Sequence, residues 1–360
     1  MLIQEERFPV KDILLYGFLP GFLKKIIYRI KGYHIGKKVS LGIGSVICGE
    51  NVSVGDHTSI GFFTIIRGRN IKIGSFVNIG ATTILDTPNL EIGDGSRINE
   101  QVFVGGLQFP DSKLVLGKNC QIMQRSFLNP TKSIVVGDDS GIGGDSLLFG
   151  HNSWLSQFEG YPVEFDSIEI GKSVSVAWRV FLLPGTKIGD GAIIGANSLV
   201  RSTIPPKCLA VGFPAKVVSK HPDFPRPVSD AEKVDILRHI VGEMINFFTG
   251  SGLSCEKLGN DTYEVTQLRR SILGKKKKTW RMRVNYDMVR DDDIPSLLDK
   301  IDVFLSLRAI PGKFRKSLGQ RRVMWIDIEK KEQPLSWNEL GDEVTLYLKR
   351  YGVRFFRTEE

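Results

Sequence analysis

A repeat of an aliphatic residue followed by glycine runs through the chain between residues 35 and 189. The pairs are Ile35-Gly36, Val54-Gly55, Ile73-Gly74, Ile92-Gly93, Leu116-Gly117, Val136-Gly137, Ile170-Gly171 and Ile188-Gly189. Their steps are 19, 19, 19, 24, 20, 34 and 18 residues, so the base period lies near 18 residues, or three hexapeptides. Within a unit, aliphatic residues recur every six positions, as at Ile73, Ile79 and Leu85. A fixed period of this length is typical of a solenoid.

The hexapeptide period predicts a triangular solenoid. Each hexapeptide supplies one short strand and one corner, and its aliphatic residue points inward onto its equivalent in the next coil. Gly, Asp, Asn and Ser at the corners tolerate the backbone bends. One coil cannot bury its own apolar stack, so many coils are needed. Ordinary hairpins with glycine turns are the alternative, but hairpins do not keep a constant step over so long a segment.

The end of the repeat, residues 168–218, carries an ordered set of motifs. An Ile170-Gly171 coil is followed by Pro184-Gly185 with IGDG, then by a GANSLV coil and the exit GFPAK. This order resembles the closing pattern of the hexapeptide-repeat acyltransferases, and the resemblance covers about residues 34–220. It implies a left-handed parallel β-helix and acyl-CoA-dependent transfer. The left-handed crossover comes from the resemblance, because parallel crossovers are otherwise right-handed.

Function is expected where a regular scaffold is interrupted, because loops on a rigid frame carry chemistry. The 24-residue step places about six extra residues near 105–110, and the 34-residue step places about sixteen near 151–166. His151 stands at the base of the larger insertion. The resemblance implies that such a histidine is the general base that deprotonates the acceptor, and an imidazole suits this task near neutral pH. The alternative is a structural loop histidine.

The same insertion holds the candidates for acceptor binding, Asn152, Trp154 and Tyr161. Aromatic faces and amide groups suit a carbohydrate, although the aromatic residues could equally pack onto a neighbouring subunit. Glu159 is a candidate for orienting the imidazole and stabilising its cation, as a carboxylate does in other histidine-base sites. The alternative for Glu159 is a solvated carboxylate.

The donor site is expected in the last coils. The resemblance implies that Ala196 lies against acetyl-CoA or another acyl-CoA, and that Arg201, Ser202 and the exit residue Lys216 contact it. Trp178 and Arg179 are further candidates, and lysine and arginine suit the anionic end of CoA. The alternative for each cation is an exposed surface charge.

Composition bounds the other possibilities. The chain has 49 Lys and Arg against 40 Asp and Glu, a net charge of +9, which fits anionic ligands without choosing among them. The four cysteines are widely spaced and form no metal-ligand pattern, which favours a reducing cytosol. The early acids do not suit a signal peptide, and no long apolar run predicts a transmembrane helix. We therefore expect a cytoplasmic protein, with the inner face of the membrane as a further option.

The segments beside the solenoid have other patterns. Residues 1–33 predict a helical segment, split into two short helices at Pro20-Gly21. Its basic second half either caps the first coil, which we favour, or brings residues 8–31 to an anionic membrane. We expect residues 34–220 to form the β-helix acyltransferase domain and residues 221–360 to form an α+β domain of unknown role.

Within residues 221–360 the pattern predicts helices at 231–248, 294–310 and 335–352. It predicts strands at 262–274, 279–288 and 321–330, with Lys275–Lys278 at a solvated hairpin tip. Acids nearly balance bases here, so no nucleic acid is expected as a partner. The four lysines could instead meet a phosphorylated substrate or an acidic carrier protein.

The resulting hypothesis is an O- or N-acyltransferase that acts on a sugar or sugar-nucleotide acceptor. The resemblance implies a homotrimer with active sites between subunits. A non-catalytic scaffold and a carrier-protein-dependent acyltransferase are the alternatives. A γ-type carbonic anhydrase shares the fold but needs three histidine ligands. In the solenoid His34, His57 and His151 lie several coils apart, so no metal is expected.

Overall fold

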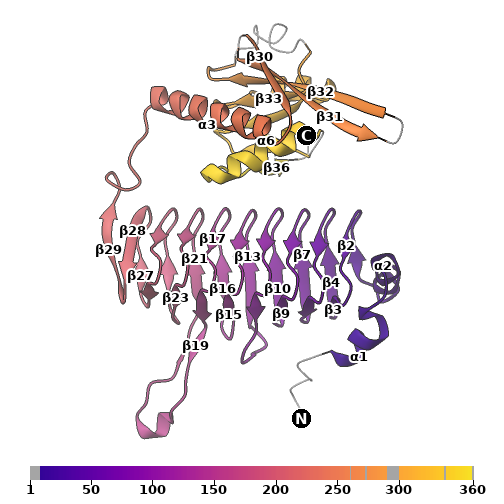
Figure 1. Cartoon of the computed structure of the whole chain (residues 1–360). Coiled ribbons are helices and arrows are strands. Elements are labelled where there is room, and N and C mark those ends of the chain that lie inside the picture. The colour runs from indigo at the N-terminus through magenta and orange to yellow at the C-terminus, as the bar shows by residue number, and fades with distance from the viewer. Residues whose placement is uncertain (1–8, 260, 272–273, 290–299, 336–337, 359–360) are drawn as a thin grey trace. The chain divides into compact units, whose positions relative to one another are not determined.

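The computed structural model describes residues 9–259, 261–271, 274–289, 300–335 and 338–358. The chain divides into two compact units, residues 1–227 and 228–360. The first holds a stack of parallel coils preceded by short helices, and the second a mixed sheet with helices (Figure 1).

Three parallel sheets form the sides of the solenoid. The first sheet contains β1 (His34–Ile35), β4 (Asn51–Val54), β7 (Asn70–Ile73), β10 (Asn89–Ile92), β13 (Lys113–Leu116), β16 (Ile134–Val136), β21 (Ile168–Ile170), β24 (Lys187–Ile188) and β27 (Thr203–Ile204). The second contains β2 (Ser40–Leu41), β5 (Ser59–Ile60), β8 (Asn78–Ile79), β11 (Arg97–Ile98), β14 (Gln121–Ile122), β17 (Gly141–Ile142), β22 (Ser175–Val176), β25 (Ile193–Ile194), β28 (Cys208–Gly212) and the antiparallel β29 (Ala215–Lys220). The third contains β3 (Val46–Cys48), β6 (Ile65–Arg67), β9 (Ile84–Asp86), β12 (Phe103–Val104), β15 (Phe127–Asn129), β18 (Leu147–Phe149), β23 (Phe181–Leu182) and β26 (Leu199–Val200).

The strand register follows the sequence period. Equivalent residues pair across steps of 19 residues, as His34 with Ser53, and across the longer steps Asn89 with Lys113 and Ile134 with Ile168. Each of the first eight coils contributes one strand to each sheet in turn, and the last coil contributes β27 and β28 to the first two sheets. The predicted fold class, a left-handed parallel β-helix with an N-terminal helical cap and a C-terminal α+β part, is confirmed.

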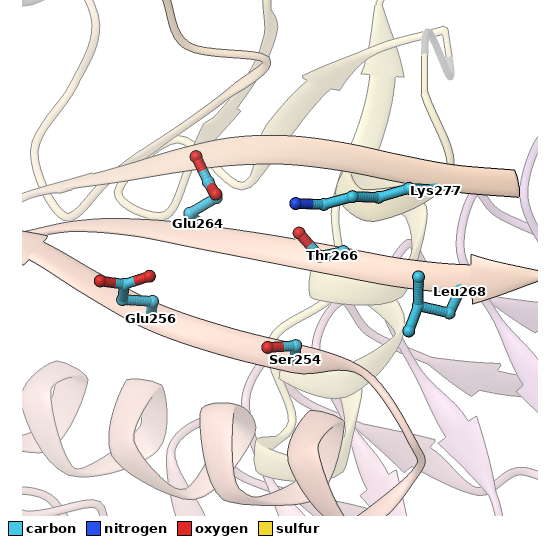
Figure 2. Close-up of a pocket in the computed structure, with 6 residues that line it drawn as sticks. All are labelled: Ser254, Glu256, Glu264, Thr266, Leu268 and Lys277. Atoms are coloured by element: carbon cyan, nitrogen blue, oxygen red, sulfur yellow. The ribbon is translucent and has the colours of Figure 1, made fainter.

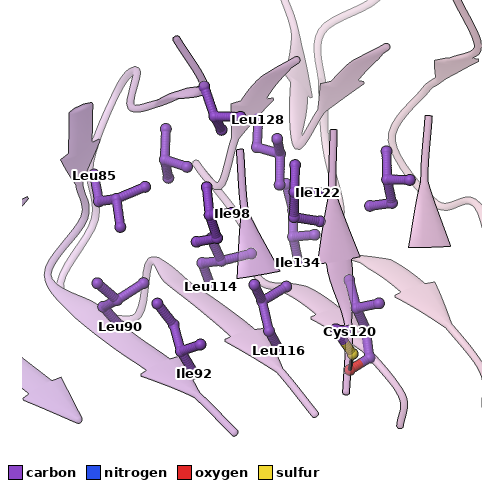
Figure 3. Close-up of a cluster of buried hydrophobic side chains, with 14 of the residues drawn as sticks. Leu85, Leu90, Ile92, Ile98, Leu114, Leu116, Cys120, Ile122, Leu128 and Ile134 are labelled. Atoms are coloured by element: carbon purple, nitrogen blue, oxygen red, sulfur yellow. Dashed lines mark hydrogen bonds between the residues drawn. The ribbon is translucent and has the colours of Figure 1, made fainter. Parts of the chain in front are cut away.

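The core of the solenoid is a set of stacked aliphatic columns. In the first sheet Ile73, Ile92, Leu116 and Val136 are each at most 2% exposed. Figure 3 shows part of this stack, with Ile92 and Leu116 in neighbouring coils and Leu90 and Leu114 beside them. Each coil buries its apolar residues only against the coils on either side, which explains the need for many repeats.

The glycine after each aliphatic residue is required by close approach between coils. A Cβ atom built on Gly55 would lie 2.6 Å from the backbone of Gly74, and one on Gly93 would lie 2.6 Å from the backbone of Gly117. Neither glycine has a positive φ. These glycines therefore allow close backbone contact between coils, whereas the sequence pattern predicts that they serve the bends at the corners.

The N-terminal helices are α1 (Val10–Asp12), the π-helix η1 (Ile13–Gly17) and α2 (Gly21–Ile30). The predicted break at Pro20 is confirmed, because Pro20 has an extended ψ of 144° and directly precedes α2. Tyr16 and Tyr28 from these helices are buried in the core of the solenoid. None of the helices in the described part of the chain is both long and apolar enough to cross a membrane.

Polar side chains of α2 satisfy backbone groups of the first coil. The buried Lys24 Nζ donates to the carbonyl oxygens of Gly42 and Ser45 at 2.7 and 2.8 Å. Arg29 donates to the carbonyl of Ile35, and the N–H of Ile47 donates to Tyr28 Oη. Burial lowers the pKa of Lys24 to about 8. The basic half of the segment thus caps the solenoid end, which would otherwise leave orphaned backbone groups.

The second unit is a seven-stranded mixed sheet with helices. Its elements are α3 (Asp230–Gly250), β30 (Ser254–Gly259), β31 (Thr262–Ser271), β32 (Gly274–Asn285), β33 (Val303–Ser306), α5 (Gly312–Gln320), β34 (Met324–Asp327), β35 (Glu332–Pro334), α6 (Glu339–Leu348) and β36 (Phe356–Thr358). Ser229 caps the start of α3, since its Oγ accepts from the N–H of Glu232 at 3.2 Å.

Two predictions for this unit are wrong. Residues 303–306 form the buried strand β33 instead of the end of a helix, because a short apolar run fits a buried strand as well as a helix. The part of that predicted helix at 294–299 lies outside the described residues. Lys275–Lys278 belong to β32 and not to a hairpin tip, since β32 begins at Gly274.

Replacement of Lys24 by methionine should weaken the solenoid end. Lys24→Met removes the Lys24 donor from the carbonyl of Ser45, while the carbonyl of Gly42 still accepts from Ser45, so the cost is about 1–3 kcal/mol. Hydrogen exchange of the amides in residues 34–48 should rise correspondingly. The exposed Lys11→Met is the matched control and should leave the exchange unchanged; equal protection in both variants would contradict the capping role.

Candidate active site

The larger insertion leaves the solenoid at the turn from the third sheet to the first. It forms a two-stranded hairpin, β19 (His151–Asn152) and β20 (Glu164–Phe165), with the 3-10 turn η2 (Gln157–Glu159) between the strands. Figure 1 shows the hairpin extending away from the coils. His151 is therefore held in a strand at the base of the hairpin, directly after β18 and Gly150.

The His151 imidazole is fixed by two buried polar side chains of the preceding coil. Its Nδ1 lies 3.0 Å from Asn129 Nδ2 and 3.1 Å from Thr131 Oγ1. The N–H and the hydroxyl of Thr131 both donate to Asn129 Oδ1. On the hairpin side, the ring stacks on Phe165, with centroids 5.9 Å apart and planes 13° from parallel. One ring nitrogen, Nδ1, is thus engaged by side chains of the preceding coil.

Asn129 and Thr131 were not predicted from the sequence. Asn129 ends β15 at a position that is only 4% exposed, and Thr131 is fully buried. The smaller insertion approaches the same group, because a Cβ on Gly106 would collide with the Asn129 amide. The available signal was the pair of polar residues around Pro130 at the end of an otherwise apolar strand.

The two insertions of the repeat meet beside His151. Phe109 from the smaller insertion makes an edge-to-face contact with Phe165, with ring centroids 5.7 Å apart. Lys132 Nζ lies 4.9 Å from the Phe109 ring and 3.2 Å from Asp111 Oδ2. The two insertions therefore contact each other beside the His151 imidazole.

The predicted acceptor residues lie on the exposed part of the hairpin. Trp154 is 96% exposed, Tyr161 is 45% exposed, and Asn152 is also exposed. Glu159 belongs to η2, and among the residues that the structure describes it makes no hydrogen bond to His151. The groups that contact the imidazole nitrogen are those of Asn129 and Thr131.

The predicted donor residues lie in the last coils but at two different corners. Trp178, Arg179 and Ala196 are in turns from the second sheet to the third. The Trp178 ring packs against Gly144, where a Cβ atom would lie 2.5 Å from the ring. Arg201 and Ser202 are in the turn from the third sheet to the first, the same corner as the His151 hairpin. Lys216 is exposed on β29.

No metal centre accompanies these residues. In the described ranges, no three His, Cys, Asp or Glu side chains are placed to hold an ion. His34 belongs to the first coil, and His57, in the turn between β4 and β5 of the second coil, stacks on Phe76. Neither has a recorded contact with His151.

A polar hollow in the second unit is a separate feature (Figure 2). It lies on β30, β31 and β32 and is lined by Ser254, Glu256, Glu264, Thr266, Leu268 and Lys277. Glu256 and Glu264 pair directly across the strands, and Glu264 accepts from Arg281 Nε at 3.0 Å. Its lining residues include neither a histidine nor a cysteine.

Comparison with known proteins finds acetyltransferases. The chain is 33% identical over 128 residues to the galactoside O-acetyltransferase of Escherichia coli, which covers 32% of this chain and 58% of that protein. It is 31% identical over 114 residues to a protein named as a lipopolysaccharide biosynthesis O-acetyl transferase, WbbJ, of Escherichia coli, covering 29% of this chain and 58% of that protein.

The chain resembles the hexapeptide-repeat acetyltransferases. It spans less than two thirds of the length of the curated relatives described above. A solved structure of AntD, an N-acyltransferase from Bacillus cereus with a dTDP-sugar and coenzyme A, matches 55% of this chain and 88% of its own at 17% identity, with a TM-score of 0.32. No model of a protein family matches the chain.

Loss of the Asn129 amide should loosen the corner that holds His151. Asn129→Ala removes the acceptor of two Thr131 hydrogen bonds in a buried place, which costs about 1–3 kcal/mol. Hydrogen exchange of the amides in residues 127–131 should increase accordingly. Asn51→Ala, at an exposed side chain, is the control and should change protection little; the same small effect at Asn129 would show that this network is not structural.

Proposed function

We propose that the chain is an acyltransferase that moves an acetyl group from acetyl-CoA to a hydroxyl or amine of a sugar or sugar-nucleotide. The observation that carries the proposal is the His151 imidazole, fixed at one nitrogen by buried groups and placed at an insertion beside the last coils. The curated relatives that match are named as O-acetyltransferases, which supports the reaction class.

The proposed chemistry needs His151 as the general base. Nε2 takes the proton of the acceptor hydroxyl or amine as its oxygen or nitrogen attacks the thioester carbonyl. The new bond to the acetyl carbon forms, and the carbon–sulfur bond then breaks. The imidazolium returns the proton to the departing thiolate, so the products are the acetylated acceptor and CoA. Backbone amides near the His151 coil are suited to stabilise the oxyanion.

Two contacts of Nδ1 bear on its protonation state. The Asn129 amide nitrogen only donates, so its contact fits an Nδ1 without a hydrogen, whereas the Thr131 hydroxyl can accept from an Nδ1–H. The role of general base requires the second arrangement, with the amide nitrogen moved off Nδ1. For Nε2 to accept a proton, Nδ1 must carry the hydrogen. In that tautomer Nδ1–H donates to Thr131 Oγ1, whose own hydrogen is given to Asn129 Oδ1 at 2.7 Å. The N–H of Thr131 donates to the same oxygen and fixes the orientation of the amide. Thr131 is therefore a positioning residue for the base, in the role first assigned to Glu159.

The donor is proposed to lie along the last coils. Ala196 gives room for the pantetheine arm, while Arg179, Arg201 and Lys216 are exposed cations suited to its phosphates. Ser202 and Trp178 complete the proposed contacts. Trp154 and Tyr161, with Asn152, are proposed to bind the acceptor.

A homotrimer with sites between subunits is part of the proposal. Trp154 and Phe158 are 96% and 104% exposed in one chain, which leaves two large apolar faces without a neighbour. A second chain that covers them would bring its surface to the hairpin that carries His151. Light scattering of the purified protein tests the mass directly.

Calorimetric titration with acetyl-CoA tests the proposed donor. The wild type and His151→Ala should bind with similar affinity, because the base contributes to chemistry and not to donor binding. Acetyl transfer to sugar-nucleotide acceptors should fall by about 10²–10⁴-fold in His151→Ala. His34→Ala, in the first coil, should retain full turnover.

Absence of acetyl-CoA binding to the folded wild type would contradict the CoA-dependent reaction. The remaining hypotheses would then be an acyltransferase that uses a carrier-protein donor and a non-catalytic scaffold. Binding without a drop in turnover in His151→Ala would remove His151 from the mechanism while leaving the donor site intact.

Replacement of Thr131 tests the tautomer argument. Thr131→Val keeps the volume of the side chain but removes the acceptor of Nδ1–H, so kcat should fall about tenfold, or about 1.4 kcal/mol. KM for acetyl-CoA should not change. Thr131→Ser should restore kcat, and a serine variant as slow as the valine variant would contradict a hydroxyl role.

A further inference from the structure

The orientation of α2 is opposite to that of an ordinary amphipathic helix. Its buried side includes Lys24 and Tyr28, whose polar atoms bond to the first coil. Its apolar residues Phe22, Ile26 and Ile30, spaced by four, are 61%, 51% and 80% exposed. Residues at i, i+4 and i+8 share one face of a helix. The apolar stripe of α2 therefore faces away from the solenoid.

A second exposed apolar stripe precedes it. The residues of α1, η1 and the turn after them that share this exposure are Val10 (52%), Leu14 (72%), Leu15 (75%) and Phe18 (56%). Lys31 Nζ lies 3.2 Å from Asp12 Oδ1, and the rings of Tyr16 and Tyr28 meet edge to face at 5.6 Å. These contacts hold the two helical segments against each other, so both stripes belong to one small structure.

The fold itself does not account for these side chains. The core of the solenoid already takes Tyr16 and Tyr28, with Ile13, Leu19 and Ile27 packed against it. Eight large apolar residues within 21 positions remain exposed, seven of them by more than half, and soluble chains rarely leave so many together without a partner. We call the set Val10, Leu14, Leu15, Phe18, Phe22, Ile26 and Ile30 the apolar cap face.

Charge around this face identifies the occupant. Residues 9–48 contain seven lysines and arginines and a single acid, Asp12. The cations are Lys11, Lys25, Arg29, Lys31, Lys37 and Lys38, together with Lys24, which is buried on the opposite side of α2. A second copy that docked through the same face would bring these two sets of like charge together, which costs free energy. A surface with an apolar interior and anionic headgroups can take up the exposed apolar residues and also attract the cations around them.

We propose that the apolar cap face lies on an anionic lipid bilayer. Phe18, Phe22 and Ile26 enter the boundary between headgroups and acyl chains, while Lys11, Lys37 and Lys38, all exposed, meet the lipid phosphates. The capping contacts of Lys24 and Arg29 keep the helices on the solenoid in the bound state. The proposal concerns where the chain works and is independent of the acyl-transfer reaction.

Co-sedimentation with lipid vesicles tests the proposal on the full chain. The wild type should bind vesicles of phosphatidylcholine with phosphatidylglycerol and should not bind vesicles of phosphatidylcholine alone. The double variant Phe22→Ser/Ile26→Ser, at exposed positions, should bind at least tenfold more weakly. Leu346→Ser, at a 59% exposed leucine of α6 in the second unit, is the matched control and should bind like the wild type.

The charge contribution is tested separately. Lys37→Glu/Lys38→Glu should weaken binding to the phosphatidylglycerol vesicles, and so should added salt. Calorimetric acetyl-CoA binding by every variant should equal that of the wild type, so failure here is distinguishable from failure of the proposed reaction.

Two results would overturn the proposal. One is wild-type binding that does not depend on Phe22 and Ile26, or no binding to anionic vesicles at all. The other is a lower mass of Phe22→Ser/Ile26→Ser by light scattering in lipid-free solution, which would show that another copy of the chain covers the face.

Discussion

Direct backbone contact between successive coils is the constraint on which the first unit depends. The N–H of each glycine in the repeat donates to the next coil, as Gly74 does to Ile92 and Gly117 to Val136. The coils approach so closely that a methyl group at Gly55 or Gly93 has no space. Because the coils touch along the flat sides of the solenoid, an inserted residue has no space there. Extra residues must therefore leave the solenoid at its corners.

Both interruptions of the repeat leave the solenoid at the same corner, where the third sheet turns toward the first, from coils that are two steps apart. The contact between Phe109 and Phe165 joins them. Asn129 belongs to the coil that lies between the two departure points, and its side chain reaches the imidazole of His151. The candidate site is thus produced by adding chain at two corners while the intervening coil stays regular.

The sequence predicted those parts of the molecule that repeat or follow local periodicity. The aliphatic-glycine steps predicted the coil register, and helical periodicity predicted the helix at 231–248 that the structure shows as α3. Contacts between residues far apart in the chain were less accessible. Nothing local to Asn129 or Thr131 shows that a histidine some twenty residues later returns to them. The role of Lys24 was hidden for a similar reason, because a lysine on an amphipathic helix is expected in water and not against carbonyl oxygens. β33 was missed because four buried residues have no period that separates strand from helix.

The regular stacking of coils also makes the solenoid a spacer of defined length. Five coil steps separate the first coil, which α2 covers, from the coil whose β18 leads into His151. At the spacing of about 4.8 Å between neighbouring strands, this corresponds to about 24 Å along the axis. Removing one whole regular coil would shorten that distance by about 4.8 Å while leaving the capped end and the His151 corner chemically unchanged. The number of repeats is therefore a dimension of the protein as well as a source of its stability.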